Sequence, residues 1–273
     1  MNKKFPKLDT EYKITQDQVL QFQRDGHLLL RNVCSKKEIE AYRHYIGAVV
    51  QEHAKTQKDL SKRDTYGKAF LQIGNIWTQD DVVKRLVFAR RFARIAAQLS
   101  ISPSVRLYHD QALYKEGHGG ITPWHQDQFY WPLDTNQSIT MWMPMVDVSQ
   151  EMGPIGFASG SHKNGYLGDI PISDESEEYF KEYIKNHGFT IHQLGEMQAG
   201  DATFHNGWTL HGASPNHSSQ MREVMTIIYY PDGTKLTKPE NQNQQADFDM
   251  YYPGMKPGEF AASSLTSILY SEM

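Results

Sequence analysis

The segment TPWHQDQFYWP, residues 122–132, combines the composition of a β-strand with two side chains that can bind metal ions. Aromatic residues favour strands, and the prolines near both ends are typical of strand boundaries. In a strand, alternate side chains lie on the same face, so His125 and Asp127 would point the same way. The pair could form a buried ion pair, or it could supply part of a metal site.

Segments of similar composition precede and follow this stretch, so the second half of the chain is predicted to be mainly β. Beyond Pro103 they are rich in aromatic and β-branched residues and are separated by Gly, Pro and Asn. The dipeptide Asn206-Gly207 predicts a hairpin, and one helix with an acidic first turn is expected over 173–186. The further predicted strands are 105–114, 138–148, 188–194, 201–206, 208–214 and 222–230.

The first hundred residues read as mostly helical. Ser35 and Glu38 have the spacing of a capping box, and Gly26 is typical of a helix end. Apolar residues then recur at helical spacing, while one short apolar run indicates a strand. The predicted helices are 15–26, 35–55 and 80–99, and the predicted strand is 27–33.

These elements predict a mainly β fold with α-helices, in which a helical layer wraps a β-barrel or sandwich. A chain of 273 residues is long enough for one large β-rich domain. We expect a single domain over 1–273, with helical support over about 1–102 and a β core over about 103–232. The polar, Pro- and Gly-punctuated tail, about 233–273, is expected to be irregular.

Composition restricts the partners and the compartment. A net charge of -4 and a pI of about 6.3 give no reason to expect nucleic acid or an anionic membrane as a partner. The single cysteine, Cys34, suits a reducing compartment, and the start of the chain lacks the apolar region of a secretory signal. We therefore expect a cytoplasmic protein that acts on a small molecule, and make no prediction of its oligomeric state.

Three further histidines, His205, His211 and His217, follow in one segment. Any one of them beside His125 and Asp127 would make a set of two imidazoles and one carboxylate. That set leaves coordination positions open and suits non-haem iron(II) and oxygen chemistry. Closed zinc sites usually use cysteine, which is nearly missing from this chain.

Arg222 begins a predicted strand whose alternate residues could line the interior of a barrel. A guanidinium in such a place is costly unless an anion meets it. A small dicarboxylic acid could do so with two parallel hydrogen bonds. Beside an open iron site, this arginine suggests 2-oxoglutarate; the alternative is an arginine at the surface or in a salt bridge.

Several fragments together resemble the phytanoyl-CoA dioxygenase family of Fe(II)/2-oxoglutarate-dependent oxygenases. They are WHQD (124–127), GSHKNG (160–165), GDATFHNGWTLHG (200–212) and an arginine eleven positions after the last histidine. The resemblance implies a double-stranded β-helix (jelly-roll, cupin-like) core with flanking N-terminal helices. It also implies a requirement for Fe(2+), 2-oxoglutarate and O2, and hydroxylation of an unactivated C–H bond with release of succinate and CO2.

The resemblance implies His125, Asp127 and His211 as the iron ligands, with His205 as the rival for the third position. His211 is preferred because its spacing to Arg222 fits the family. Retention of Asp127 argues against halogenation, since halogenating relatives have a non-coordinating residue there.

The cosubstrate contacts also follow from the resemblance. Arg222 matches the residue that binds the distal carboxylate of 2-oxoglutarate, and Gln111 and Trp142 fall where the family contacts the cosubstrate. Gln72, from the helical half, is a further candidate. Ala213 is a departure, because a small hydroxylated residue is common at this position in the family. We therefore expect one hydrogen bond to the cosubstrate to be absent or to come from another residue.

Two other functions remain open on the sequence. One is a cupin-like metalloenzyme that does not use 2-oxoglutarate, which would need the metal ligands but not an interior Arg222. The other is a non-catalytic module that binds a metal or ligand on the same fold. The aromatic residues Phe129, Tyr130 and Trp131 are expected either to wall the substrate pocket or to pack in the core.

Overall fold

Two antiparallel sheets form the centre of the computed structural model, which describes residues 5–272. The larger sheet has seven strands in the order β1 (His27–Leu30), β9 (Ala202–Asn206), β6 (Ile139–Pro144), β11 (Arg222–Pro231), β3 (Ser104–Lys115) and β13 (Ile268–Ser271), with β2 (Leu71–Gly74) also paired to β3. The smaller has four, in the order β4 (Thr122–His125), β10 (His211–Ala213), β7 (Ile155–Ala158) and β8 (Ile191–Gln193). A short pair, β5 (Leu133–Asp134) and β12 (Lys235–Leu236), lies apart from both.

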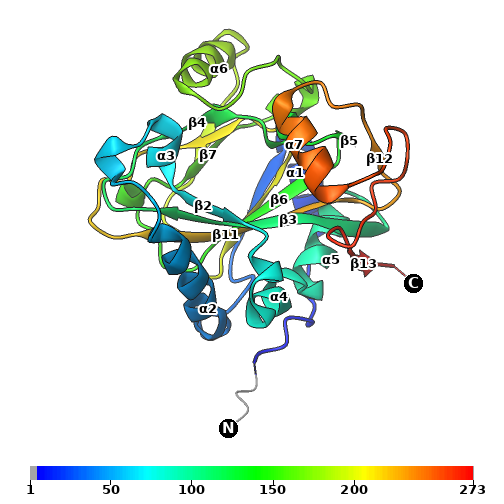
Figure 1. The fold of residues 1–273 in the computed structure, drawn as a ribbon, viewed down its shortest axis with the longest axis horizontal. Coiled ribbons are helices and arrows are strands. Elements are labelled where there is room, and N and C mark those ends of the chain that lie inside the picture. The colour runs from blue at the N-terminus through cyan, green and yellow to red at the C-terminus, as the bar shows by residue number, and fades with distance from the viewer. Residues whose placement is uncertain (1–4, 273) are drawn as a thin grey trace.

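Helices cover the outer face of the larger sheet and flank the smaller one (Figure 1). The α-helices are α1 (Gln16–Asp25), α2 (Lys36–Ala54), α3 (Thr65–Ala69), α4 (Asp81–Val87), α5 (Arg90–Leu99), α6 (Asp174–Asn186) and α7 (Gln242–Tyr251). The short 3-10 helices are η1 (Leu60–Lys62), η2 (Ile76–Thr78), η3 (Asp127–Tyr130), η4 (Gln150–Met152) and η5 (Ser161–Asn164). No helix among the described residues has the length and apolar character needed to cross a membrane.

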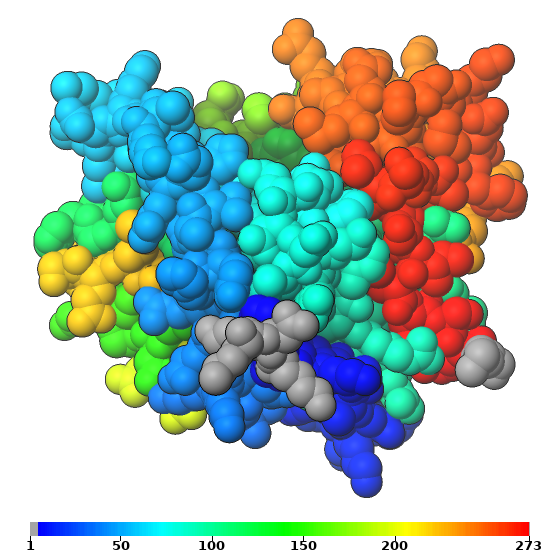
Figure 2. Space-filling model, turned by 60° about the horizontal axis from the view of Figure 1, so that its bottom comes forward, coloured from blue at the N-terminus to red at the C-terminus, as the bar shows by residue number. Residues whose placement is uncertain are grey.

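The principal hydrophobic core lies between the larger sheet and helices α2, α4 and α5. Figure 2 shows the outer side of this layer, where the blue and cyan N-terminal helices lie beside the red C-terminal segment. That segment ends in β13, which pairs with β3 and contacts α5. The described C-terminal segment is therefore part of the layer that supports the larger sheet.

The predicted helix starts in the N-terminal region are confirmed by their capping geometry. Thr15 and Ser35 each form a complete capping box, with Gln18 and Glu38 respectively. Gly26 ends α1 with a φ of 77°, in the left-handed region that glycine adopts without steric cost.

The helical region differs from its prediction in two places. The predicted helix 80–99 is broken into α4 and α5, because Ala89 has an extended backbone with a ψ of 116°. Residues 71–74 form strand β2, which was not predicted. Its buried Leu71 and Ile73 alternate with Gln72 and Gly74, but four residues are too few for a distinct period-2 signal.

The two longest strands of the larger sheet, β3 and β11, agree with their predicted ranges. Their pairing defines the rows of side chains that face the smaller sheet. β11 lies between β3 and β6, and Thr226 is opposite Gln111 on one side and Trp142 on the other. Arg222, at the start of β11, is opposite Lys115. Residues far apart in the sequence are therefore brought into one cross-strand row.

Two predictions about the segments beside the histidines were wrong. The strand expected within residues 122–132 stops at His125, and Asp127 begins η3, because the Gln128 amide N–H leaves the sheet and donates to the Gly207 carbonyl at 2.9 Å. Asn206-Gly207 does not form a hairpin. β9 belongs to the larger sheet and β10 to the smaller, so this turn carries the chain from one sheet to the other.

The C-terminal tail is also more ordered than predicted, since it contains helix α7. Asn241 caps this helix by accepting from the Gln244 amide, and Phe248 and Tyr251 bury their rings in a second hydrophobic cluster. The sequence of the helix has no strong apolar periodicity of its own, so its stability comes from these tertiary contacts.

Candidate active site

All seven predicted site residues line one cavity of about 230 Å³ between the two sheets. This volume is slightly below the usual range for ligand pockets, which is about 300–1,000 Å³. The residues are Gln72, Gln111, His125, Asp127, Trp142, His211 and Arg222.

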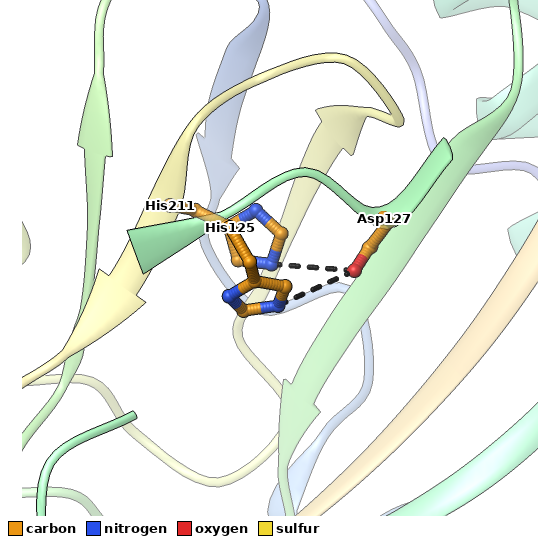
Figure 3. Close-up of side chains that lie close together, drawn as sticks. All are labelled: His125, Asp127 and His211. Carbon is orange, nitrogen blue, oxygen red and sulfur yellow. Dashed lines mark ion pairs between the residues drawn. The ribbon is translucent and has the colours of Figure 1, made fainter. Parts of the chain in front are cut away.

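Three of these side chains converge on one point, as Figure 3 shows. His125 ends β4, His211 begins β10 directly opposite, and Asp127 is the first residue of η3. The Nε2 atoms of both histidines lie 3.5 Å from Oδ1 of Asp127. One donor atom from each residue lies within 4.8 Å of the others, so the three can hold a metal ion together.

The outer nitrogen of each histidine is held by a backbone carbonyl. Nδ1 of His125 is 2.8 Å from the Pro123 oxygen, and Nδ1 of His211 is 3.0 Å from the Thr209 oxygen. A carbonyl can only accept, so Nδ1 carries the proton in both rings and the lone pair of Nε2 faces the cavity. Metal-binding histidines are commonly oriented in this way.

The charge states of the group favour metal binding. Burial by itself raises the pKa of Asp127, but His211, His125 and His205 together hold it well below its usual range. Burial, and then the neighbouring His125, hold the pKa of His211 well below its usual range. A carboxylate beside a neutral imidazole is the ligand form that binds a metal without first releasing protons.

His205 lies beside the group but makes a different contact. Its Nε2 is 3.2 Å from Oδ2 of Asp127, the oxygen that also accepts from the Thr140 hydroxyl at 2.8 Å. Its Nδ1 is buried without a partner among residues 5–272, so the ring proton is on Nε2 and is donated to Asp127. Of the two rivals the structure therefore groups His211 with His125 and Asp127, and places His205 behind the carboxylate.

Arg222 is almost wholly buried, with 1% of its surface exposed. Its Nη1 donates to the Gly153 carbonyl, and the guanidinium lies 5.3 Å from the ring centroid of Trp142. Nε has no partner, and no carboxylate of the described residues pairs with this side chain. Burial lowers the pKa of Arg222 to about 9, so a cation is kept in the cavity without a counter-ion from the protein.

The predicted glutamines form a short hydrogen-bonded chain at the side of the cavity. Nε2 of Gln72 donates to Oε1 of Gln111 at 3.0 Å, and the Tyr66 hydroxyl donates to Gln72. Gln111 also lies in the cross-strand row with Thr226 and Trp142. Because Tyr66 belongs to α3, these hydrogen bonds connect α3 to the floor of the cavity.

The three aromatic residues that follow Asp127 divide between the cavity and the core. Tyr130 and Trp131 do line it, whereas Phe129 is buried and is not part of the lining. His109 and Asp247 also face the cavity, and Asp247 belongs to the helix α7 that the sequence did not predict. No pattern in the sequence pointed to either, because their place depends on packing between distant segments.

Comparison with known proteins agrees with this geometry. The sequence model of the family described as phytanoyl-CoA dioxygenase (PhyH) matches residues 22–224. The chain belongs to this family.

Individual relatives are distant in sequence. Ectoine dioxygenase of Bordetella parapertussis is 22% identical over 248 residues, which cover 83% of this chain and 79% of that protein. The structure of the non-heme alpha ketoglutarate dependent carbocyclase SnoK from nogalamycin biosynthesis superposes with a TM-score of 0.76 at 20% identity, covering 94% of this chain and 96% of that one. EctD from S. alaskensis, solved with 2-oxoglutarate and 5-hydroxyectoine, gives a TM-score of 0.67 at 22% identity, covering 86% and 85%.

Proposed function

We propose that this protein is an Fe(II)- and 2-oxoglutarate-dependent dioxygenase, built on a double-stranded β-helix, that hydroxylates an unactivated C–H bond of a small organic molecule. One observation carries the proposal. A buried arginine without a counter-ion, Arg222, shares a single cavity with the converging group His125, Asp127 and His211. Membership of the phytanoyl-CoA dioxygenase family supports the same chemistry.

The residues present fit an Fe(II) ion. His125, His211 and Asp127 would hold the ion through two imidazole nitrogens and one carboxylate oxygen, a ligand set that leaves coordination positions open. Bound Fe(II), with 2-oxoglutarate and O2, would supply the chemistry that replaces a substrate C–H hydrogen by a hydroxyl group, with release of succinate and CO2. The carbonyls that hold each Nδ1, and the Thr140 hydroxyl on Asp127, keep the ligand atoms aimed at the metal position.

The rest of the cavity suits the cosubstrate. Arg222 offers two parallel donors to the distal carboxylate of 2-oxoglutarate, and the Trp142 ring covers its guanidinium. Lys115, opposite Arg222 on β3, donates to the Gly120 and Ser214 carbonyls and thereby ties together the loops around this end. Gln111 and Gln72 present amide groups along the side of the same space.

The substrate is proposed to be a small molecule, as the limited cavity of about 230 Å³ suggests. Fe(II)/2-oxoglutarate chemistry has more than one outcome on this fold, since SnoK is named a carbocyclase. We favour hydroxylation over halogenation, because Asp127 would occupy the coordination position that a halide needs. A cytoplasmic location is proposed on the single, buried and unpaired cysteine, Cys34.

The test is an anaerobic titration of the protein with Fe(II) and then 2-oxoglutarate, followed by visible absorption. We expect an absorption band that needs both additions, and succinate formation once O2 is admitted. Arg222→Ala should weaken 2-oxoglutarate binding while leaving Fe(II) binding intact. Equal loss of both would point to a metalloenzyme that does not use 2-oxoglutarate, and binding without any turnover would point to a non-catalytic module.

A further inference from the structure

Asp247 places a carboxylate at the cavity. Neither the proposed metal site nor the proposed cosubstrate site involves this carboxylate. It lies on α7, and its Oδ2 accepts a hydrogen bond from the Tyr108 hydroxyl at 2.7 Å. Among residues 5–272, Oδ1 has no hydrogen-bond partner and the carboxylate forms no ion pair. One oxygen of the group is therefore free to meet a ligand.

The position of Asp247 is set by contacts on both sides of it along α7. Nε2 of Gln244 donates to the Phe129 carbonyl of η3 at 3.0 Å, and the Tyr251 hydroxyl accepts from Nδ2 of Asn75 at 2.9 Å. Because η3 begins with Asp127, the helix that carries Asp247 is attached to the same element that carries a candidate metal ligand. The carboxylate therefore has a defined position relative to the reaction centre.

The charges of the loaded cavity leave Asp247 unbalanced. Fe(II) carries two positive charges and 2-oxoglutarate two negative ones, and the charge of Asp127 is balanced by that of Arg222. The remaining charge is that of Asp247, since no other lysine or arginine of residues 5–272 lines the cavity. His109, the nearest basic group of this wall, is neutral because burial lowers its pKa to about 4. A half-buried carboxylate that has no cationic partner in the protein would be stabilised by a cation from the ligand.

The walls near Asp247 also suit a cation. Tyr130 and Trp131 line the same cavity, and Tyr108, which donates to Asp247, packs against Trp131 with ring centroids 5.4 Å apart. Aromatic faces beside a carboxylate are the surroundings in which proteins bind ammonium groups.

We propose that the substrate carries a cationic nitrogen, which pairs with Asp247 and is enclosed by the aromatic residues Tyr130 and Trp131. This inference rests on the proposed dioxygenase function and specifies the substrate class of the same site. Burial raises the pKa of Asp247 to about 6, so the empty site has an ionised carboxylate at neutral pH.

The test compares cations with neutral molecules of the same shape on the protein loaded with Fe(II) and 2-oxoglutarate without O2. The probes are choline paired with 3,3-dimethylbutan-1-ol, and small cyclic amines paired with the corresponding cyclic alcohols. Perturbation of the absorption band and calorimetry give the Kd of each. Asp247→Asn keeps an acceptor for Tyr108 but removes the charge. Asp249→Asn, at an exposed carboxylate on the same helix, is the matched control.

We expect at least one cation to bind tenfold or more tightly than its neutral partner. The Asp247→Asn variant should lose this preference, Asp249→Asn should keep it, and both should retain the absorption band. The inference is overturned if no pair shows a preference for the cation, or if Asp247→Asn leaves the preference unchanged. Absence of the band in the unmodified protein would instead contradict the dioxygenase function, and calorimetry of the same pairs would still decide the role of Asp247.

Discussion

His125 and His211 are direct cross-strand partners on β4 and β10, with their ring centroids 4.1 Å apart. The pairing register of the smaller sheet therefore brings together two residues that are 86 positions apart in the chain. A shift of one residue would turn one ring to the opposite face, so the geometry of the metal group is a property of strand register. Gly212, next to His211, allows the close approach, since a Cβ there would lie 2.9 Å from the Thr122 carbonyl oxygen.

Removal of either cross-strand histidine should abolish metal binding. His125→Ala and His211→Ala each delete one of three ligands, and we expect no detectable iron-dependent turnover of 2-oxoglutarate and no Fe(II) binding at micromolar concentrations. The control is His187→Ala, at an exposed ring after the end of α6. Turnover that survives either substitution would remove that residue from the metal group.

His205 should behave as a positioning residue and not as a ligand. His205→Phe keeps an aromatic ring against Phe157 but removes the N–H that Asp127 accepts. We expect Fe(II) affinity to fall by roughly 10- to 100-fold, as is typical when a partner of a metal ligand is lost. The melting temperature should be retained, because the unpaired Nδ1 is lost with the imidazole. If His205→Phe abolished Fe(II) binding and His211→Phe preserved it, His205 would be the metal ligand and His211 the positioning residue.

Thr140 should contribute to Fe(II) affinity through its hydrogen bond to the Asp127 carboxylate. Thr140→Val has nearly the same shape but cannot donate to Oδ2 of Asp127, so the carboxylate is less well oriented. We expect Fe(II) affinity to fall by about tenfold, with the affinity for 2-oxoglutarate in the Fe(II)-loaded protein little changed. Thr140→Ser keeps the hydroxyl and should retain wild-type affinity. If both variants bind Fe(II) equally, the hydroxyl has no part in orienting Asp127.

The β-rich second half of the chain and the group His125, Asp127 and His211 could be inferred from local sequence patterns and the family resemblance. Aromatic and β-branched runs identified β3, β6, β9 and β11, and family spacing singled out His211 over His205. Without the family resemblance, the order of the residues could not separate these two histidines, because both face the cavity. Only the change of sheet at Asn206-Gly207 places His205 on the larger sheet and His211 on the smaller.

The substrate end of the cavity could not be predicted from the sequence. Asp247 lies in a polar segment without helical periodicity, and α7 forms because Gln244 and Phe248 contact η3 and the second hydrophobic cluster. Such contacts join segments more than a hundred residues apart, and no local pattern reports them.

Asp247 should make stability depend on pH. Its folded-state pKa of about 6 is above the unfolded value of ~3.9, so the ionised carboxylate costs stability above pH 6. This cost, on the order of 2 kcal/mol, is relieved as the pH falls through about 6 towards 4. Asp247→Asn should therefore melt roughly 4–8 °C higher than the wild type at pH 8, with the difference vanishing near pH 4. Melting curves that differ equally at every pH would contradict the raised pKa.

Gly207 should be required for the crossing between the two sheets. A Cβ at this position would lie 2.2 Å from Oγ of Ser138 and 3.1 Å from both the Gln128 Cβ and the Trp131 ring. Gly207→Ala should therefore cost about 1–3 kcal/mol, as overpacking of a core typically does. Because the Gly207 carbonyl also accepts from the Gln128 amide, next to Asp127, Fe(II) affinity should fall together with the melting temperature. Gly195→Ala, at an exposed glycine with no atom closer than 4.0 Å, is the control and should be nearly neutral. A stable Gly207→Ala protein with unchanged Fe(II) affinity would show that the crossing tolerates a side chain and does not position Asp127.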